Sequence, residues 1–171
     1  MKHNITKIDI NDINLIKKIY RNGEENMGAI SDNPFNVRED KKAYNTNIVN
    51  SETFFCDIRN EELVNTVKKY IKCNDVNEYI ANIHYINYLV GEEAKPHTDK
   101  LASLRTYIIL LNDTFAGGEF YLKDEHIPLK MGEVLEFPGE EIHSVRPITN
   151  GNREVLVAWV KLSQKNKKTL L

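Results

Sequence analysis

Two histidines and an aspartate are the side chains of this sequence best suited to holding a metal ion. His97 and Asp99 stand two positions apart, and residues i and i+2 of an extended segment point to the same face. His143 follows 44 positions after Asp99, again within a strand-like segment. Two imidazoles and one carboxylate form a facial triad, which leaves three positions of an octahedral ion open and suits ferrous iron.

An arginine in an apolar strand supplies the second chemical signal. Arg153 opens the segment REVLVAWVKL and shares a face with Val157 and Trp159, while the opposite face is also largely apolar. Burial of a guanidinium there costs free energy unless it pairs with an anion or its side chain reaches water at the end of the strand. The sequence leaves both alternatives open. Beside a ferrous triad, an arginine can hold the distal carboxylate of a dicarboxylic keto acid that chelates the metal. The combination predicts 2-oxoglutarate as a cosubstrate.

The second half of the chain, which must position these residues, reads as short strands separated by turns. The segments are rich in Val, Ile, Tyr and Phe, and glycine-containing turn signals divide them. Because no gap is long enough for a crossover helix, we expect an antiparallel sandwich or barrel. The strand that carries Arg153 should be central and covered on both faces. The expected strands are residues 79–90, 104–112, 118–122, 132–138, 142–148 and 153–162.

The first half of the chain carries helix signals. Asn11 or Asp12 is suited to capping a helix over residues 13–20, and Asn60 to capping a second helix over residues 62–72.

These patterns together predict an α+β protein of one domain, residues 1–171. Residues 1–79 should supply supporting helices and loops, residues 80–162 the β core with the site, and residues 163–171 a flexible tail.

Composition is that of an ordinary soluble globular protein. Of 171 residues, 41% are hydrophobic and 28% are charged, and the formal net charge is −2. A chain without a global positive field is a poor partner for nucleic acid. No apolar run has the length of a membrane span or of a signal core, so we expect a soluble cytoplasmic protein without a membrane partner. Cys56 and Cys73 match no zinc or redox spacing and should be free thiols.

The remaining histidines carry weaker signals. His3 lies near the terminus, His84 lies inside an expected strand, and His126 lies in a segment typical of a turn. We expect a structural role for each of them.

The motifs between residues 83 and 162 follow a characteristic order. A tyrosine and a glycine precede His-x-Asp, and Leu-Asn, Gly-Gly-Glu, Gly-x-x-x-x-Phe, His-x-Val-x-Pro, a glycine, a basic residue and a tryptophan come after it. Here they are Tyr88, Gly91, His97, Asp99, Leu111, Asn112, Gly117, Gly118, Glu119, Gly132, Phe137, His143, Val145, Pro147, Gly151, Arg153 and Trp159. In order and spacing, this half of the chain resembles the Fe(II)/2-oxoglutarate-dependent dioxygenases of the prolyl 4-hydroxylase-like group.

The resemblance implies a double-stranded β-helix (jelly-roll) core with flanking N-terminal helices. By position, His97, Asp99 and His143 would be the catalytic iron ligands. Arg153 would bind the distal carboxylate of 2-oxoglutarate, and the Tyr88 hydroxyl would contact the same molecule.

The activity implied by the resemblance is hydroxylation of a C–H bond, with a prolyl residue in a peptide or protein as one target. Dioxygen is consumed, succinate and CO2 are released, and ascorbate is a further cofactor that the resemblance allows. An aspartate at position 99 favours hydroxylation over halogenation, because halogenases of this type leave that position free for halide.

Three positions near the expected pocket depart from the family pattern. Ser103 and Leu110 stand where an arginine and a tyrosine are common, and Ala94 stands where an aromatic residue is common. Arg105 is a candidate to replace the missing arginine through a local slip. Two alternatives therefore stay beside the prolyl hypothesis: a non-catalytic jelly-roll binding module, and the same oxidation of a free amino acid or another small molecule.

Overall fold

The computed structural model describes residues 3–23, 52–55, 60–100 and 103–163. Its elements, in chain order, are β1 (Asn4–Lys7), α1 (Ile10–Gly23), β2 (Glu52–Phe55), α2 (Glu61–Lys68), β3 (Glu78–Tyr88), β4 (Ala94–His97), β5 (Arg105–Leu110), β6 (Phe115–Gly117), β7 (Phe120–Leu122), β8 (Glu125–Ile127), β9 (Glu133–Pro138), β10 (His143–Val145), β11 (Ile148–Gly151) and β12 (Arg153–Leu162). The α+β class expected from the sequence is confirmed.

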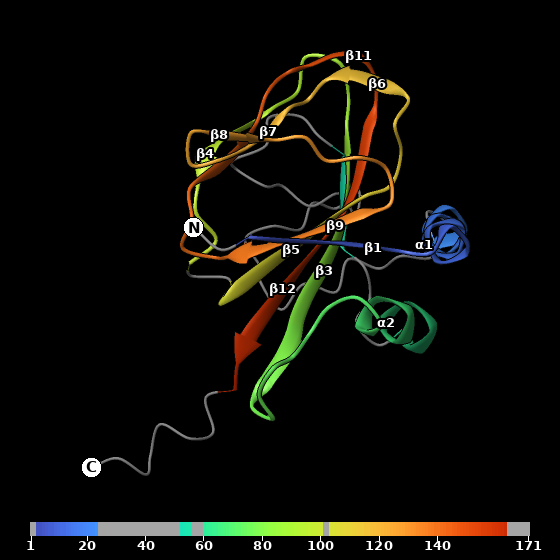
Figure 1. Cartoon of the computed structure of the whole chain (residues 1–171). Helices are drawn as coiled ribbons and strands as arrows, with labels where there is room; N and C mark the ends of the chain where they lie inside the picture. The colour runs from blue at the N-terminus through green and yellow to red at the C-terminus, as the bar shows by residue number, and fades with distance from the viewer. Residues whose placement is uncertain (1–2, 24–51, 56–59, 101–102, 164–171) are drawn as a thin grey trace, which may run out of the picture.

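Two antiparallel sheets build the jelly-roll core. The large sheet has six strands in the order β1-β9-β5-β12-β3-β2, and the small sheet has four in the order β4-β10-β7-β8. The strands β11 and β6 pair as a separate two-stranded sheet. Figure 1 shows both helices on one side of the large sheet and the strands β4, β7 and β8 on the other side.

Strand β12 lies between two apolar layers. Its residues Leu156 and Ala158 join the cluster formed with the helices, which includes Ile16 and Val67. Alternate residues of the same strand face the small sheet and pack with Phe137 and its neighbours. Burial on both faces confirms that this strand is central, and it explains why the strand reads as a continuous apolar run.

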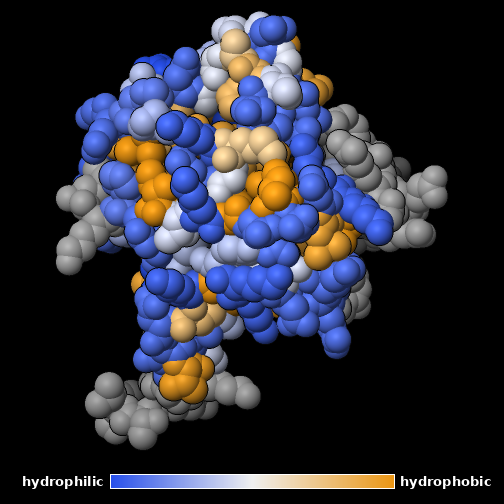
Figure 2. Space-filling model, turned by 45° about the vertical axis from the view of Figure 1, so that its right-hand side comes forward, coloured by the Kyte–Doolittle hydropathy of each residue, from blue (hydrophilic) through white to orange (hydrophobic). Residues whose placement is uncertain are grey.

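The face of the molecule in Figure 2 is mostly hydrophilic, and apolar side chains occur on it as separate patches within a polar surface. None of the helices in the described part of the chain is long and apolar enough to cross a membrane.

The start of α1 differs from the sequence-based expectation. The helix begins at Ile10, and the side chain of Asp9 accepts a hydrogen bond of 2.7 Å from the backbone N–H of Asn11. The prediction of Asn11 or Asp12 as the cap is therefore wrong. Asp12 is buried instead and accepts hydrogen bonds from Lys69 and Tyr70, which ties α1 to the end of α2.

The second helix agrees better with its prediction. Asn60 caps α2, because its side chain accepts a 3.0 Å hydrogen bond from the backbone N–H of Leu63. The helix ends at Lys68, earlier than expected, although Ile71 still packs into the apolar cluster.

Five short strands lie outside the ranges expected from the sequence: β1, β2, β4, β6 and β8. A sixth, β11, shares only Ile148 with an expected strand. The N-terminal half was expected to hold helices and loops, yet β1 and β2 form the two edges of the large sheet. His126, expected in a turn, lies in β8 at the edge of the small sheet. Strands of three or four residues are too short for a clear period-two pattern, and their ladder partners hold them in place.

Truncation of Ile16 tests the helical layer. Ile16 is 1% exposed and Ile10 of the same helix is 51% exposed. We expect Ile16→Ala to lower the free energy of unfolding by about 2–5 kcal/mol, because it removes buried methyl groups and leaves a cavity. Ile10→Ala should change it by less than about 0.5 kcal/mol. Urea unfolding followed by circular dichroism measures both, and equal losses would contradict the layer assignment.

The buried ring nitrogens of His84 predict a pH dependence of stability. Its ring packs edge-on against Trp159, with 4.4 Å between centroids, and burial lowers the pKa of His84 to about 3. The unfolded chain, with an ordinary histidine pKa near 6.5, then binds a proton that the folded state resists. Stability should fall as the pH drops below about 6.5, by up to ~1.4 kcal/mol per pH unit from this group.

The free energy of unfolding of the metal-free protein, kept in chelator, is measured between pH 7 and pH 4. The change of this free energy with pH is the slope to be compared between variants. His84→Phe should flatten the slope. His126→Phe, which replaces an exposed histidine, should leave it unchanged. Identical slopes in the wild type and His84→Phe would contradict the burial of a neutral imidazole.

Candidate metal centre and anion site

Antiparallel pairing of β4 with β10 brings two of the singled-out residues together. His97 ends β4, His143 begins β10, and the two are direct partners in the register. Their ring centroids lie 4.2 Å apart. Asp99 follows two residues after His97, and one potential ligand atom of each side chain lies within 4.8 Å of the other two. The three residues that the sequence proposes for a metal therefore converge.

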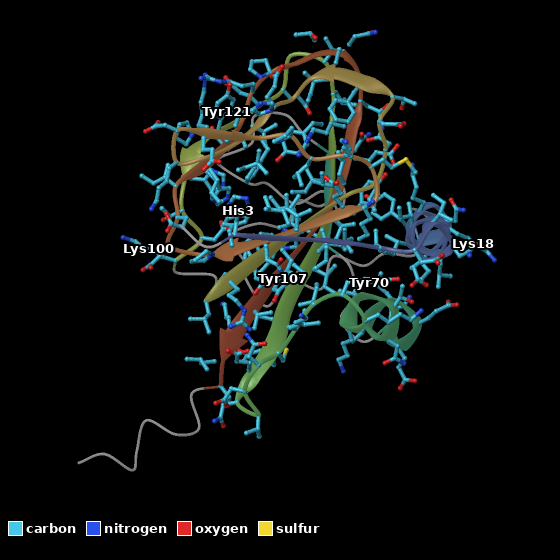
Figure 3. The ribbon with its side chains drawn as sticks, in the orientation of Figure 1. His3, Lys18, Tyr70, Lys100, Tyr107 and Tyr121 are labelled. Carbon is cyan, nitrogen blue, oxygen red and sulfur yellow. The ribbon has the colours of Figure 1, made fainter. Side chains whose placement is uncertain are left out.

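This cluster lies on the side of the large sheet that faces the small sheet. Figure 3 labels Lys100, the residue after Asp99, on the side away from Tyr70 and the helical layer. Within the parts of the chain that the structure describes, these three residues form the one group of His, Cys, Asp or Glu side chains arranged to hold a metal.

Backbone carbonyls orient both imidazoles in the same way. Nδ1 of His97 lies 2.6 Å from the carbonyl oxygen of Lys95, and Nδ1 of His143 lies 3.0 Å from that of Glu141. Because a carbonyl only accepts, each Nδ1 carries a proton and donates it. In the neutral ring the lone pair is then on Nε2. Nε2 of His97 lies 3.9 Å from Oδ1 of Asp99, and Nε2 of His143 lies 3.5 Å from Oδ2 of Asp99.

His143 sits in an apolar environment that keeps it neutral. Its ring contacts Phe137, with centroids 4.9 Å apart, and Phe120, at 5.9 Å. Burial lowers the pKa of His143, and this outweighs the opposite effect of the Asp99 carboxylate. A neutral imidazole is the form that binds a metal. Two such rings and a carboxylate fit a ferrous ion, with three coordination positions left for ligands.

Arg153 lies at the start of β12 on the same face as the residues that contact the small sheet. Arg153 is only 2% exposed, so its guanidinium is buried and does not reach water at the end of the strand, which was the other alternative that the sequence left open. Among the residues that the structure describes, no carboxylate forms an ion pair with its guanidinium. Burial lowers the pKa of Arg153 from its ordinary value, although arginine remains charged at any physiological pH.

Tyr88 and Gly118 shape the surroundings of this arginine. Tyr88 is the register partner of Arg153 on β3, and the guanidinium carbon lies 5.5 Å from the centre of its ring. Burial raises the pKa of Tyr88 to about 12, so its hydroxyl keeps its proton. Gly118 has a φ of +69°, and a Cβ there would lie 3.0 Å from Cδ of Arg153. A buried guanidinium against an aromatic ring is suited to an anionic ligand.

The positions that depart from the family pattern are also located. Leu110 and Ala94 are buried in the apolar layer between the sheets, and Ser103 is buried beside Thr106. Arg105 does not replace the missing arginine, so this prediction is wrong. It lies on the opposite face of β5 and forms a bidentate pair with Glu78, because neighbouring residues of a strand point to opposite faces.

The sequence predicted no contact with the site for two residues that support it, although Trp159 was one of the motif residues. Thr106 and Trp159 both donate a hydrogen bond to the Asp99 carboxylate. The available signal was a threonine and a tryptophan on the inward faces of two neighbouring strands, which by itself is typical of ordinary core packing.

The other singled-out residues lie outside the cluster. His126 is exposed on β8, where its ring packs 5.4 Å from that of Tyr121, and His3 precedes β1. Cys73 is an exposed free thiol, as expected, and Cys56 falls outside the described residues.

Comparisons of sequence place this core within a known family. The model of the 2OG-Fe(II) oxygenase superfamily matches residues 83–161. A PKHD-type hydroxylase of Paraburkholderia phymatum is 28% identical over 96 residues, which is 50% of this chain and 41% of that protein. The chain thus spans about two fifths of the length of this curated relative.

Comparisons of structure extend over nearly the whole chain. A viral collagen prolyl hydroxylase of Paramecium Bursaria Chlorella virus-1, solved with 2OG, has a TM-score of 0.68 at 14% identity and covers 96% of this chain and 97% of that one. A prolyl hydroxylase of Trichoplax adhaerens, solved with a peptide fragment of a hypoxia inducible factor, has a TM-score of 0.60 at 14% identity, covering 92% and 82%. These likenesses show a shared fold.

The matched family model, the related hydroxylases and the jelly-roll fold lead to one conclusion: the core of this chain, residues 83–161, matches the 2OG-Fe(II) oxygenase superfamily, and the chain is similar in fold to the prolyl hydroxylases.

Proposed function

We propose that the protein hydroxylates a C–H bond of a prolyl residue in a peptide or protein, using Fe(II), 2-oxoglutarate and O2. One oxygen atom of O2 enters the substrate as a hydroxyl group, the other enters succinate, and the 1-carboxylate of 2-oxoglutarate leaves as CO2. The observation that carries the proposal is the convergence of His97, Asp99 and His143 in the same inter-sheet layer as the buried Arg153.

The three converging side chains would hold the metal. Nε2 of His97, Nε2 of His143 and a carboxylate oxygen of Asp99 are the donor atoms, and the two carbonyl contacts fix the imidazole tautomers before metal binds. Bound ferrous iron would supply the oxidation, by accepting both the keto acid and dioxygen at its open positions.

Arg153 and Tyr88 would hold the other end of 2-oxoglutarate. The guanidinium offers paired donors to a carboxylate, and the protonated Tyr88 hydroxyl offers one more. A dicarboxylate satisfies this buried cation, whereas a monocarboxylic keto acid leaves it without an anion.

The apolar layer between the sheets would keep water away from the reacting groups. Phe120, Phe137 and Leu110 are each at most 2% exposed. In such surroundings charge pairs are stronger than in water, and unproductive reactions of the bound oxidant with solvent are suppressed.

Solved structures of similar fold support the prolyl target. Solved structures with the same fold include a collagen prolyl hydroxylase and a prolyl hydroxylase holding a peptide. Succinate formation should be compared with proline-containing peptides, free proline and other free amino acids, with and without ascorbate as a reductant. Stimulation by peptides, with a gain of one oxygen atom in the peptide mass, supports the proposal, and stimulation by free amino acids alone contradicts the prolyl-peptide part.

Removal of the Asp99 carboxylate tests the iron site. We expect the wild type with Fe(II) and 2-oxoglutarate to show a weak charge-transfer absorption band without oxygen, and to form succinate with oxygen. Asp99→Ala should lose both, since loss of a metal ligand costs more than the ~10–100-fold typical of an outer partner. Asp113→Ala, which changes an exposed aspartate, is the control. A wild type with neither the band nor succinate would reject the proposal.

Removal of the buried guanidinium tests the cosubstrate site. Arg153→Leu should raise the KM for 2-oxoglutarate by about 30-fold or more, because a charge pair within a buried site is lost. It should also narrow the preference for 2-oxoglutarate over 2-oxopentanoate, which lacks the distal carboxylate, and leave the affinity for Mn(II) alone unchanged.

Arg146→Leu, which removes an exposed arginine of the same half of the chain, should retain the wild-type KM. An Arg153→Leu protein that folds and keeps both the wild-type KM and the wild-type preference would show that the anion site lies elsewhere.

A further inference from the structure

The carboxylate of Asp99 presents two unlike oxygen atoms. Oδ2 accepts hydrogen bonds from Thr106 Oγ1 at 2.9 Å and from Trp159 Nε1 at 3.0 Å. Oδ1 accepts no hydrogen bond from a residue within the described ranges. Oδ1 lies 3.9 Å from Nε2 of His97, and Oδ2 lies 3.5 Å from Nε2 of His143. A carboxylate oxygen has two in-plane lone pairs, so two donors occupy the accepting capacity of Oδ2.

Both donors come from rigid parts of the core. Thr106 on β5 and Trp159 on β12 are direct partners across the two strands, so their side chains stand next to each other on the inward face. Thr106 is 0% exposed and Trp159 is 7% exposed. Asp99 itself lies in the segment after β4, where its backbone N–H donates to the carbonyl of Gly139 at 2.7 Å. The sheet therefore fixes the orientation of a carboxylate that a connecting segment carries.

We infer that Thr106 and Trp159 are positioning residues that reserve Oδ2 of Asp99 for the protein and leave Oδ1 as the one oxygen that binds the metal. The inference rests on the proposed metal site. A carboxylate that binds through one oxygen takes one coordination position, whereas a bidentate carboxylate takes two. With two imidazoles, the first arrangement leaves the three open positions that a chelating keto acid and dioxygen require.

The role assigned to the two donors is consistent with the energetics of outer contacts. Hydrogen bonds to an ionised carboxylate are roughly twice as strong as neutral ones, and loss of such an outer partner typically weakens metal binding by about 10–100-fold. Thr106 has a single hydroxyl hydrogen and lies 3.3 Å from the Ser103 hydroxyl, so the shorter contact to the charged oxygen is the better acceptor for it.

Trp159 also provides a direct readout, because the sequence contains one tryptophan. Its indole N–H contacts the carboxylate that would bind the metal, so its fluorescence should report occupation of the site. The probe is Co(II) alone, added without oxygen to the purified full chain. Isothermal titration calorimetry gives the affinity, and the visible spectrum of bound Co(II) reports its coordination.

Two variants remove the donors, and two keep the site intact. Thr106→Val removes the hydroxyl with little change in shape, and Trp159→Phe removes the N–H while keeping an aromatic ring. Thr106→Ser keeps the hydroxyl. Tyr107→Phe removes a hydroxyl from the neighbouring residue of β5, which points to the opposite face and donates to the carbonyl of Lys72.

We expect Thr106→Val and Trp159→Phe each to weaken Co(II) binding by about 10–100-fold and to change the visible spectrum of bound Co(II). Fluorescence quenching should move to the same higher Co(II) concentrations in Thr106→Val, while Thr106→Ser and Tyr107→Phe match the wild type. If Trp159→Phe does not fold, Thr106→Val with its serine control decides the matter.

The outcomes separate this inference from the proposal beneath it. Wild-type affinity and an unchanged Co(II) spectrum in Thr106→Val would overturn the positioning role while leaving the metal site intact. A wild type that binds no Co(II), or that binds it equally well after Asp99→Ala, would overturn both.

Discussion

The antiparallel pairing of β4 with β10 is the contact on which the site depends. It sets His97 opposite His143, and the carbonyl two residues before each histidine fixes the ring so that Nε2 is the free nitrogen. A shift of one residue in this pairing would turn one imidazole to the outer face of the small sheet. The pairing is short, so the apolar contacts of His143 and its neighbours must hold it in register.

The large sheet holds in fixed positions the side chains that surround the histidines of the small sheet. One face of β12 carries both the cation of Arg153 and the indole of Trp159, while its other face is fixed by the helical layer. Because the strand is buried on both sides, neither group can move without disturbing a packed layer. The fold thus separates two tasks: the small sheet supplies histidines, and the large sheet supplies the fixed charges and donors around them.

Much of this arrangement could be read from the sequence. His97, Asp99 and His143 were recognisable from their types and spacing as a metal-binding triad. Arg153 was recognisable because a guanidinium is costly in an apolar strand, and the long strands were recognisable from their apolar runs. The short edge strands could not be predicted, since three or four residues carry too little pattern. Arg105 was misassigned because β5 begins at Arg105, so spacing from Ser103 could not show which face Arg105 takes. Its partner Glu78 shows that it takes the outer face.

The most direct test of the account is a crystal structure of the full chain with Mn(II) and 2-oxoglutarate, using anomalous scattering to locate the metal. The account predicts one Mn(II) bound by Nε2 of His97, Nε2 of His143 and Oδ1 of Asp99, with the distal carboxylate of 2-oxoglutarate on Arg153. A metal bound at other side chains, or a cosubstrate that leaves the Arg153 guanidinium without an anion, would contradict it.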